Sequence, residues 1–426
     1  MQLPSFFLTT LYIATLSLVA VHADQPVSPA TPQPGCHHFK KSQKVMGYYP
    51  SYNYKDQKPT DINFSLYTDA LFFVAVPERN FTLNFGDLKN EIAERLMFDF
   101  VKQAKEANVT TCLSVGGWTG SQHFSFLTST PDNRKKFAQL LVNYTQSRGF
   151  NCIDLDWEYP NHQGIGCNGI NPKDTVNFGL LLKEIRALWK EAQLTVALSI
   201  TGLVGADGKP ATIAETKDIV ESVDFVNIMA YDVTGQWSES TGPLAPLKAT
   251  CAPEGSAVSV ETSVTAMLKA GFKVSQLIMG IPAYAKRLEL VSPKLLPKVV
   301  NGTTTFYYQN HTDKAPPGGK FDDQPGVDVC GKPQTYGGSW TVRELIAQGW
   351  LQPDFKTGGK GYKRYYDECS EGPFLASDKY LISYDDLESS VNKAQFSKSQ
   401  QLAGIYFFDT LGTTDATIKA AGEALR

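Results

Sequence analysis

The sequence contains no block of basic residues, and its formal net charge over 426 residues is only −3. A nucleic-acid-binding surface needs clustered Lys and Arg, so we expect no nucleic acid partner. No glycine-rich dinucleotide fingerprint follows any strand-like segment. Cys and His do not occur at zinc-site spacing, since His37 and His38 are adjacent in a polar stretch. We therefore expect neither a metal ion nor a cofactor.

Long apolar runs are scarce as well. The one candidate, Pro4 to Val21, is nearly all apolar or hydroxyl-bearing, and Val21-His22-Ala23 resembles a signal-peptide cleavage site. A membrane anchor is the alternative, but the run is short for a span, which needs about 20 apolar residues. We expect residues 1–23 to be a signal peptide and residues 24–41, rich in Pro and polar side chains, to be a flexible leader. The protein is then secreted and not bound to a membrane, with the cell wall as a second location.

Sequons and cysteines fit secretion. Six Asn-x-Ser/Thr sequons are candidate glycosylation sites, at Asn63, Asn80, Asn108, Asn143, Asn301 and Asn310. Seven cysteines allow disulfides in an oxidising compartment, although sequence alone leaves their connectivity open. Cys112 and Cys152 lie in apolar runs, where we expect two small buried side chains. The pairings that we expect are Cys167 with Cys251 and Cys330 with Cys369.

Short apolar runs alternate with helical patterns along the chain. Eight runs predict strands, at Val45–Pro50, Ala70–Val76, Thr111–Gly117, Phe150–Glu158, Leu194–Thr201, Asp224–Tyr231, Leu277–Tyr284 and Leu402–Phe408. Periodic apolar segments between them predict helices, such as Leu88–Ala107, Asp132–Arg148, Asp174–Glu191 and Val260–Ala270. Strands that alternate with helices indicate parallel β/α units, and eight of them indicate a closed TIM barrel of the α/β class. An open doubly wound sheet is the alternative.

One interval interrupts this alternation. The seventh strand begins at Leu277 and the eighth only at Leu402, an interval too long for a single crossover. Its middle part is rich in Gly, Pro, Lys and Tyr, which favours short strands and turns. We expect residues 288–380 to form an insertion subdomain beside the barrel mouth, and residues 42–287 and 381–426 to form the barrel.

The fourth expected strand carries three carboxyl groups. Asp154, Asp156 and Glu158 are two residues apart, with apolar residues between them. Because side chains alternate along a strand, all three carboxyls should share one face. Three like charges inside a protein are expensive, so at least one carboxyl must hold a proton, which makes the stretch a candidate acid/base device. A solvated edge strand is the alternative, but the apolar neighbours favour burial.

Further polar and aromatic residues fall at the carboxyl ends of strands, where barrels of this kind place their functional groups. They are Met229, Tyr231, Asp232, Tyr284 and Phe408, with Tyr48, Tyr49, Trp118 and Trp237 nearby. Carboxyls at the base of a groove with aromatic walls suit a sugar chain, because pyranose faces stack on aromatic rings. For each aromatic taken alone, core packing is the alternative.

Several motifs together carry a family resemblance. They are Ser114-Val115-Gly116-Gly117, Asn151 to Glu158, Met229-Ala230-Tyr231-Asp232, Gly47-Tyr48-Tyr49-Pro50, Gly280-Ile281-Pro282 and Ser383-Tyr384-Asp385-Asp386. Over nearly its whole mature length the chain resembles the chitinases of glycoside hydrolase family 18, and Gly242 to Leu247 with Cys167 and Cys251 resembles secreted fungal members. The resemblance implies a (β/α)₈ barrel with an α+β insertion between strand 7 and helix 7. It also implies chitin or its oligosaccharides as the ligand.

The resemblance implies roles for individual residues. The family retains the anomeric configuration without an enzyme nucleophile. Glu158 would protonate the glycosidic oxygen, and the substrate's own N-acetyl carbonyl would attack the anomeric carbon. Asp156 would orient the acetamido N–H, Tyr231 would donate to its oxygen, and Asp154 would share a proton with Asp156. The implied sugar-binding residues are Tyr48, Gly117, Trp118, Tyr159, Met229, Asp232, Trp237, Tyr284 and Phe408.

Three positions depart from the family pattern. Asn151 replaces the first motif Asp, Phe408 replaces the usual last-strand Trp, and Ala285 replaces the Gly after the seventh-strand Tyr. We expect all three to lie on or behind the subsite where the sugar distorts, and Asn151 to change the coupling to Asp154. Together they threaten the positioning of the substrate, where an error of about 1 Å can cost about 10²-fold in rate.

These departures leave two main hypotheses. The first is a secreted monomer that binds chitin oligosaccharides but hydrolyses them poorly, and so sequesters chitin fragments or decorates a cell wall. The second is an active retaining chitinase with Glu158 as the acid. A structural protein without sugar affinity is a third class, which the expected groove aromatics disfavour.

Overall fold

The computed structural model describes residues Gln43–Arg426, and the expected signal peptide and leader lie outside this range. Eight parallel strands follow one another in the order β1-β18-β8-β7-β6-β5-β4-β2, and pairing of β1 with β2 closes the barrel. Their bounds are β1 Lys44–Pro50, β2 Asp69–Pro77, β4 Thr110–Gly116, β5 Cys152–Asp156, β6 Gln193–Ser199, β7 Phe225–Met229, β8 Leu277–Pro282 and β18 Gly404–Phe408. The short β3 (Leu83–Asn84) pairs antiparallel with the end of β2. All eight expected strands are confirmed, and with them the closed barrel.

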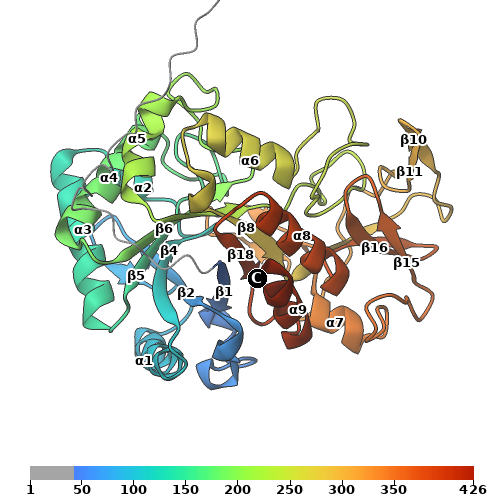
Figure 1. The fold of residues 1–426 in the computed structure, drawn as a ribbon, viewed down its shortest axis with the longest axis horizontal. Helices are drawn as coiled ribbons and strands as arrows, with labels where there is room; N and C mark the ends of the chain where they lie inside the picture. Colours follow the sequence, from blue (N-terminus) through green and yellow to red (C-terminus); the bar gives the residue numbers. More distant parts are fainter. Residues whose placement is uncertain (1–42) are drawn as a thin grey trace, which may run out of the picture. The chain divides into compact units, whose positions relative to one another are not determined.

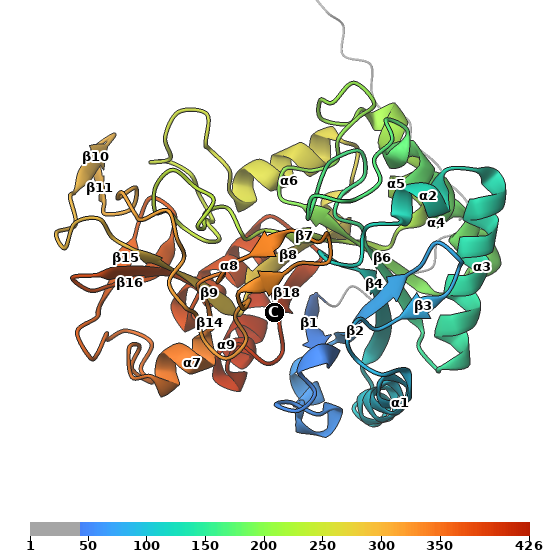
Figure 2. The same ribbon diagram turned by 180° about the vertical axis from the view of Figure 1, so that it is seen from behind.

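Helices surround this barrel in both views (Figure 1, Figure 2). They are α1 Asn90–Glu106, α2 Phe124–Thr128, α3 Pro131–Ser147, α4 Asp174–Leu188, α5 Ile213–Ser222, α6 Val260–Lys269, α8 Leu387–Ser399 and α9 Asp415–Leu425. After β1 the chain forms short 3-10 turns instead. Local sequence sets the helix starts. Before α3, the hydroxyl of Thr130 accepts a hydrogen bond from the Asn133 N–H. Before α5, Thr212 forms a capping box with Glu215. The helices between strands confirm the α/β class.

The hydrophobic core follows the alternation of side chains along the strands. Outward residues such as Ile153 and Leu155 pack with Trp157 and with apolar residues of the surrounding helices in one large cluster. Inward residues form a second, smaller cluster inside the barrel, which includes Met46 and Tyr48. On β5 the outward positions are therefore apolar, whereas Asp154 and Asp156 take the inward positions.

The segment between β8 and α8 forms a separate antiparallel sheet, of strand order β14-β9-β17-β16-β15. Its elements are β9 Tyr284–Glu289, β14 Ser339–Thr341, α7 Val342–Ala347, β15 Lys363–Asp367, β16 Gly372–Ala376 and β17 Tyr380–Ser383. Two hairpins, β10 (Lys298–Val300) with β11 (Thr303–Thr305) and β12 (Gly326–Val327) with β13 (Pro333–Gln334), complete it. This α+β insertion lies where the resemblance implied. The first strand, β9, begins directly at the barrel mouth.

Both expected disulfide pairings are wrong. Cys167 bonds to Cys330 and Cys251 bonds to Cys369. Each bond joins a loop of the barrel to the insertion, so cysteines far apart in sequence meet in space. Sequence alone carries no information on how the insertion folds back on the barrel, so it does not give these partners.

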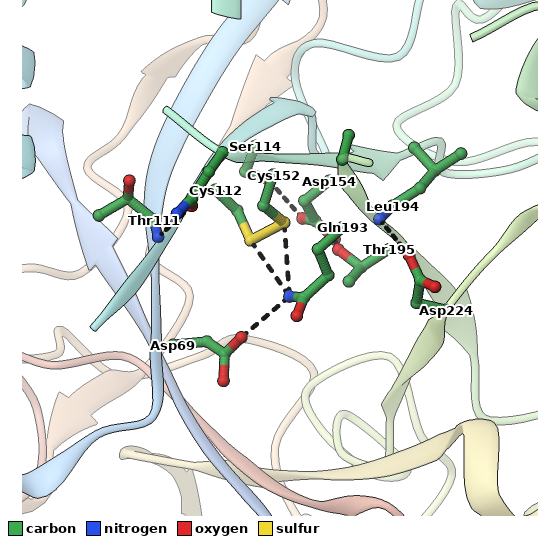
Figure 3. Close-up of a disulfide and its surroundings, with 12 residues drawn as sticks. Asp69, Thr111, Cys112, Ser114, Cys152, Asp154, Gln193, Leu194, Thr195 and Asp224 are labelled. Carbon is green, nitrogen blue, oxygen red and sulfur yellow. Dashed lines mark hydrogen bonds between the residues drawn. A yellow bond between two sulfur atoms is a disulfide. The ribbon is translucent and has the colours of Figure 1, made fainter. Parts of the chain in front are cut away.

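Cys112 and Cys152 are buried, as expected, but they also form a disulfide. They are register partners on the neighbouring strands β4 and β5, which brings their Cα atoms to 4.2 Å. Figure 3 shows the bond inside the barrel, with the side-chain amide of Gln193 between the two sulfurs and Asp69. That amide donates to the Asp69 carboxylate at 2.9 Å. The bond therefore fixes the register of the two strands directly beneath Asp154.

Two surface properties bear on the expected compartment. The asparagines of all six sequons have exposed side chains, so each is accessible to glycosylation, which stays a prediction. Within residues 43–426, no helix combines the length and the apolar character that crossing a membrane requires.

Removing the barrel disulfide should destabilise the fold. The bond closes a loop across a sequence separation of 40 residues, for which the chain-entropy model gives about 4 kcal/mol. We expect the double variant Cys112→Ala/Cys152→Ala to lose a free energy of unfolding of this order, measured by urea denaturation. The wild-type protein in reducing buffer is the matched control and should lose more. A double variant as stable as the oxidised wild type would mean that the bond does not form.

Candidate active site

The three carboxyl groups lie together at the mouth of the barrel. Asp154 and Asp156 lie on β5, and Glu158 follows two residues beyond its end. All three are buried, with exposed fractions of 0%, 4% and 8%. Because solvent cannot screen them, their protonation states depend on the groups that surround each one.

Asp154 accepts four hydrogen bonds. Its Oδ2 accepts from the Ser114 hydroxyl at 2.7 Å and the Tyr48 hydroxyl at 3.2 Å. Its Oδ1 accepts from the Thr195 hydroxyl at 2.5 Å and the Asn227 amide at 3.3 Å. Burial raises the pKa of Asp154, and these four donors oppose that rise because they stabilise the carboxylate. The donor set favours an ionised Asp154.

Asp156 has the opposite surroundings. Its Oδ1 is buried and has no hydrogen-bond partner within the described chain. Burial, then the charges of Glu158 and Asp154, raise the pKa of Asp156 well above its ordinary range. Of Asp154 and Asp156, Asp156 therefore has the less favourable surroundings for a charge and holds a proton more readily.

Hydrogen bonds to its backbone hold Glu158 in place, and burial raises the pKa of its carboxyl. Its N–H donates to the Ser121 hydroxyl at 2.8 Å, and its carbonyl accepts from the Asn168 amide at 2.6 Å. Burial raises the pKa of Glu158 to about 7, the Tyr159 hydroxyl lowers it, and the Asp232 carboxylate adds to the rise. A carboxyl with such a pKa holds its proton in mildly acidic solution and can act as a general acid.

Gly116, the last residue of β4, and Gly117 after it allow β5 to end in this position. Gly116 has φ of +117°, and a Cβ there would lie 2.0 Å from the Asp156 carbonyl oxygen. Only glycine fits so close to the neighbouring backbone. Gly117 is buried and its N–H donates to the same carbonyl at 2.8 Å. Gly117, expected to contact sugar, thus supports the strand that carries the carboxyls.

Aromatic rings surround the carboxyls. The Phe408 ring lies 5.5 Å from that of Tyr48, 5.3 Å from Phe73 and 6.1 Å from Tyr231, measured between centroids. Phe408 is half-buried, so part of its ring is open to the mouth. It thus occupies the position at the end of β18 that was expected from the sequence.

The end of β7 contributes a second group of expected residues. The Tyr231 hydroxyl is 2.9 Å from that of Tyr406. Asp232 is exposed and accepts from the Tyr284 hydroxyl at 2.8 Å, which links the barrel to β9 of the insertion. Met229 is partly buried and packs against the inner cluster of the barrel, so its contacts are those of a core residue.

The remaining expected residues lie on the rim. Tyr159 is half-buried beside Glu158. Trp118 and Trp237 are 49% and 62% exposed. The Lys286 ammonium lies 5.8 Å from the ring centres of both Trp237 and Tyr284, which places Trp237 near Tyr284. Trp118 lies in the loop that follows β4.

Asn151 and Ala285, two of the three departures, make their contacts away from Asp154. Asn151 is exposed just before β5, and its side chain accepts from the Thr111 N–H at 2.9 Å. This contact does not involve Asp154, and the expected effect of Asn151 on proton sharing stays a prediction. Ala285 is fully buried in the core of the insertion, where its methyl packs with residues such as Val342. Phe408 alone of the three lies at the mouth.

Sequence reasoning missed several polar partners inside the barrel. Thr195 and Ser114 are register partners of Asp154 on the adjacent strands β6 and β4. Asn227 and Tyr406 lie in the middle of the apolar strands β7 and β18. A polar residue inside an otherwise apolar strand was the available signal, because buried polar groups need partners.

The ionisation of Glu158 should lower stability at alkaline pH. Its folded pKa of about 7 exceeds its ordinary value of 4.5, so protonation favours the folded state. This stabilisation is fully present below about pH 4.5 and is lost as pH rises through about 7. We expect Glu158→Gln to gain about 3 kcal/mol relative to wild type between pH 4 and pH 8, measured by urea denaturation. The exposed Glu254→Gln is the control, and parallel stability curves for all three proteins would refute the shift.

Within residues 43–426, no group of three or more His, Cys, Asp or Glu side chains has the arrangement of a metal site. Three buried carboxyls in different surroundings, with aromatic rings beside them, can bind a neutral polar ligand and transfer a proton to it.

Comparisons with known proteins give the family of the chain. The family model described as glycosyl hydrolases family 18 matches residues 44–412. A chitinase-like effector of Moniliophthora roreri is 35% identical over 376 residues, which cover 86% of this chain and 88% of that protein. Chitinase A1 of Niallia circulans is 28% identical over 91% of this chain and 59% of its own length. The crystal structure of a Rhizomucor miehei chitinase matches with a TM-score of 0.77 and 26% identity, over 90% of this chain and 100% of that one. The chain therefore belongs to glycosyl hydrolase family 18.

Proposed function

We propose that this protein is secreted and binds chitin oligosaccharides at the barrel mouth, but hydrolyses them poorly. The observation that carries the proposal is the cluster of Asp154, Asp156 and Glu158, buried beneath aromatic rings at the carboxyl ends of the strands. This cluster offers fixed hydrogen-bond groups in a place where water cannot compete well.

An N-acetyl group matches the cluster chemically. It presents one N–H donor and one carbonyl acceptor. The unpartnered Oδ1 of Asp156 can accept from the N–H, and the phenol of Tyr231 can donate to the carbonyl. The partly open ring of Phe408 can stack on the apolar face of the pyranose, and Trp118 and Trp237 can receive neighbouring sugars of the chain.

Two observations support poor turnover. Phe408 offers less stacking area than an indole and no N–H donor, at the place where the sugar must be held for reaction. The Moniliophthora roreri relative is described as chitinase-like rather than as a chitinase. A binder without rapid turnover suits the sequestration of chitin fragments, or a location in the cell wall.

Secretion is supported by three disulfides and by the description of that relative as an effector. The exposed sequon asparagines are compatible with passage through a glycosylating compartment. We propose that the secreted protein acts as a monomer.

The second candidate is an active retaining chitinase. It is favoured by Glu158, whose pKa of about 7 keeps the proton available for the glycosidic oxygen in mildly acidic solution. Hydrolysis by this route should fall as pH rises through about 7, because the acid then loses its proton. Asp154, Asp156 and Tyr231 complete the set that the family implies.

Incubation with an N-acetylglucosamine tetramer, with pull-down on insoluble chitin in parallel, separates the two candidates. We expect the protein to be retained on the polymer. We also expect it to release N-acetylglucosamine dimers no faster than about 10⁻² of the rate of an active family member. Glu158→Gln is the matched control, because it keeps the shape of the site and removes the acid. Rapid dimer release that Glu158→Gln abolishes would establish the enzyme, and failure to bind either ligand would reject both candidates.

Replacing Phe408 tests the cause of the poor turnover. We expect Phe408→Trp to raise tetramer hydrolysis about tenfold, within the roughly 10²-fold that misplacement can cost, because an indole holds the sugar more firmly. Asn151→Asp is the control. It restores the family residue just before β5, where Asp can still accept from the Thr111 N–H, and it should leave the rate unchanged. An equal effect of both changes would contradict the assignment.

A further inference from the structure

Tyr406 lies directly behind Tyr231 and is completely buried inside the barrel. Its hydroxyl is 2.9 Å from that of Tyr231 and donates to the Ile228 carbonyl at 3.0 Å. Space for the ring is provided by Gly280, where a Cβ would lie 2.6 Å from both Cζ and the hydroxyl oxygen of Tyr406. The phenol is therefore held in one place by β7 and β8, which carry Ile228 and Gly280.

The number of hydroxyl protons determines which tyrosine of this pair donates to the other. Burial raises the pKa of both Tyr231 and Tyr406 well above the ordinary value, so each hydroxyl carries one proton. If Tyr406 donates to the Ile228 carbonyl, then only Tyr231 can supply the proton between the two hydroxyls. In this arrangement both protons have acceptors. In the reverse arrangement, the proton of Tyr231 has no acceptor within the described chain, which is unfavourable for a buried hydroxyl.

We propose that Tyr406 is a positioning residue that draws the proton of Tyr231 away from the ligand, so that an N-acetyl carbonyl must compete with Tyr406 for it. This inference rests on the proposed function, because it concerns the same sugar. It gives a specific cause for weak binding of the N-acetyl group, and none of the three motif departures supplies that cause.

Ligand binding then requires the hydrogen bond between Tyr231 and Tyr406 to change direction. Tyr406 turns its proton from the Ile228 carbonyl to the Tyr231 oxygen, and Tyr231 donates to the acetamido carbonyl. The Ile228 carbonyl keeps its bond from the Ala230 N–H at 2.8 Å, so it is not left unpaired. The reversal costs about one neutral hydrogen bond, which corresponds to a loss of about fivefold in affinity for the N-acetyl ligand.

The test is the variant Tyr406→Phe. Its affinity for the N-acetylglucosamine tetramer is measured by titration calorimetry. Phe keeps the ring over Gly280 but cannot accept the proton of Tyr231, which then points toward the ligand. We expect affinity to rise about fivefold. In the Tyr231→Phe background, Tyr406→Phe should give no gain. Unchanged or weaker binding by Tyr406→Phe, or an equal gain without the Tyr231 hydroxyl, overturns the proposal.

Tyr49→Phe is the matched control. Tyr49 is also a fully buried tyrosine, but it packs in the outer hydrophobic cluster and not among the groove aromatics with which the sequence grouped it. Its hydroxyl donates to the Gln57 carbonyl at 2.9 Å. This control should show a comparable change in stability and no change in affinity. If Tyr406→Phe does not fold, Tyr406→Met replaces it, because the flexible Met side chain fills irregular space without offering a strong acceptor.

A sugar-free measurement separates failure of this inference from failure of the proposed function. Difference ultraviolet resonance Raman spectra, wild type minus Tyr231→Phe, report whether the Tyr231 phenol donates a hydrogen bond. We expect a donor in the wild-type protein and none in the Tyr406→Phe background. A donor signature with no tetramer binding by any variant would reject the function and keep the proton arrangement. A wild-type Tyr231 that does not donate would reject the inference.

Discussion

The structure depends on placing three carboxyl groups where water cannot reach them. Burial of a charge is tolerated only when other groups compensate for the lost hydration. Here the compensation differs at each level of β5. Asp154 receives four hydrogen bonds from residues of β1, β4, β6 and β7, the pKa of Asp156 is raised well above its ordinary range, and that of Glu158 is raised to about 7. These different surroundings give the barrel mouth both an acceptor and an acid.

The backbone around the carboxyls is fixed as firmly as the side chains. Ser121 and Asn168 hold the two polar groups of the Glu158 peptide, and Gly116 lets β4 approach the carbonyl of Asp156. Beneath them, the disulfide between Cys112 and Cys152 joins the same two strands (Figure 3). The other two disulfides join barrel loops to the insertion, whose first strand supplies Tyr284 to the site. Such support is what keeps a catalytic or binding group in a productive geometry.

The residues around the Tyr231 phenol come from outside the carboxyl motif. Asn151 lies within that motif, yet its side chain accepts from the Thr111 N–H of β4. Tyr406 lies outside every motif named above, yet its hydroxyl is 2.9 Å from that of Tyr231. The Phe408 ring also lies beside Tyr231. Both Tyr406 and Phe408 belong to β18, which the carboxyl motif does not include.

The sequence by itself determined the eight strands, the barrel, the interval that holds the insertion, and the shared face of Asp154 and Asp156. These follow from local periodicity, because a strand alternates with a period of two and a helix with 3.6. Only the tertiary structure decided the disulfide partners, the positions of Asn151 and Ala285, and the contact between Tyr231 and Tyr406. Each of these joins segments far apart in the chain, so its geometry depends on how the barrel closes and how the insertion packs, which no local pattern encodes.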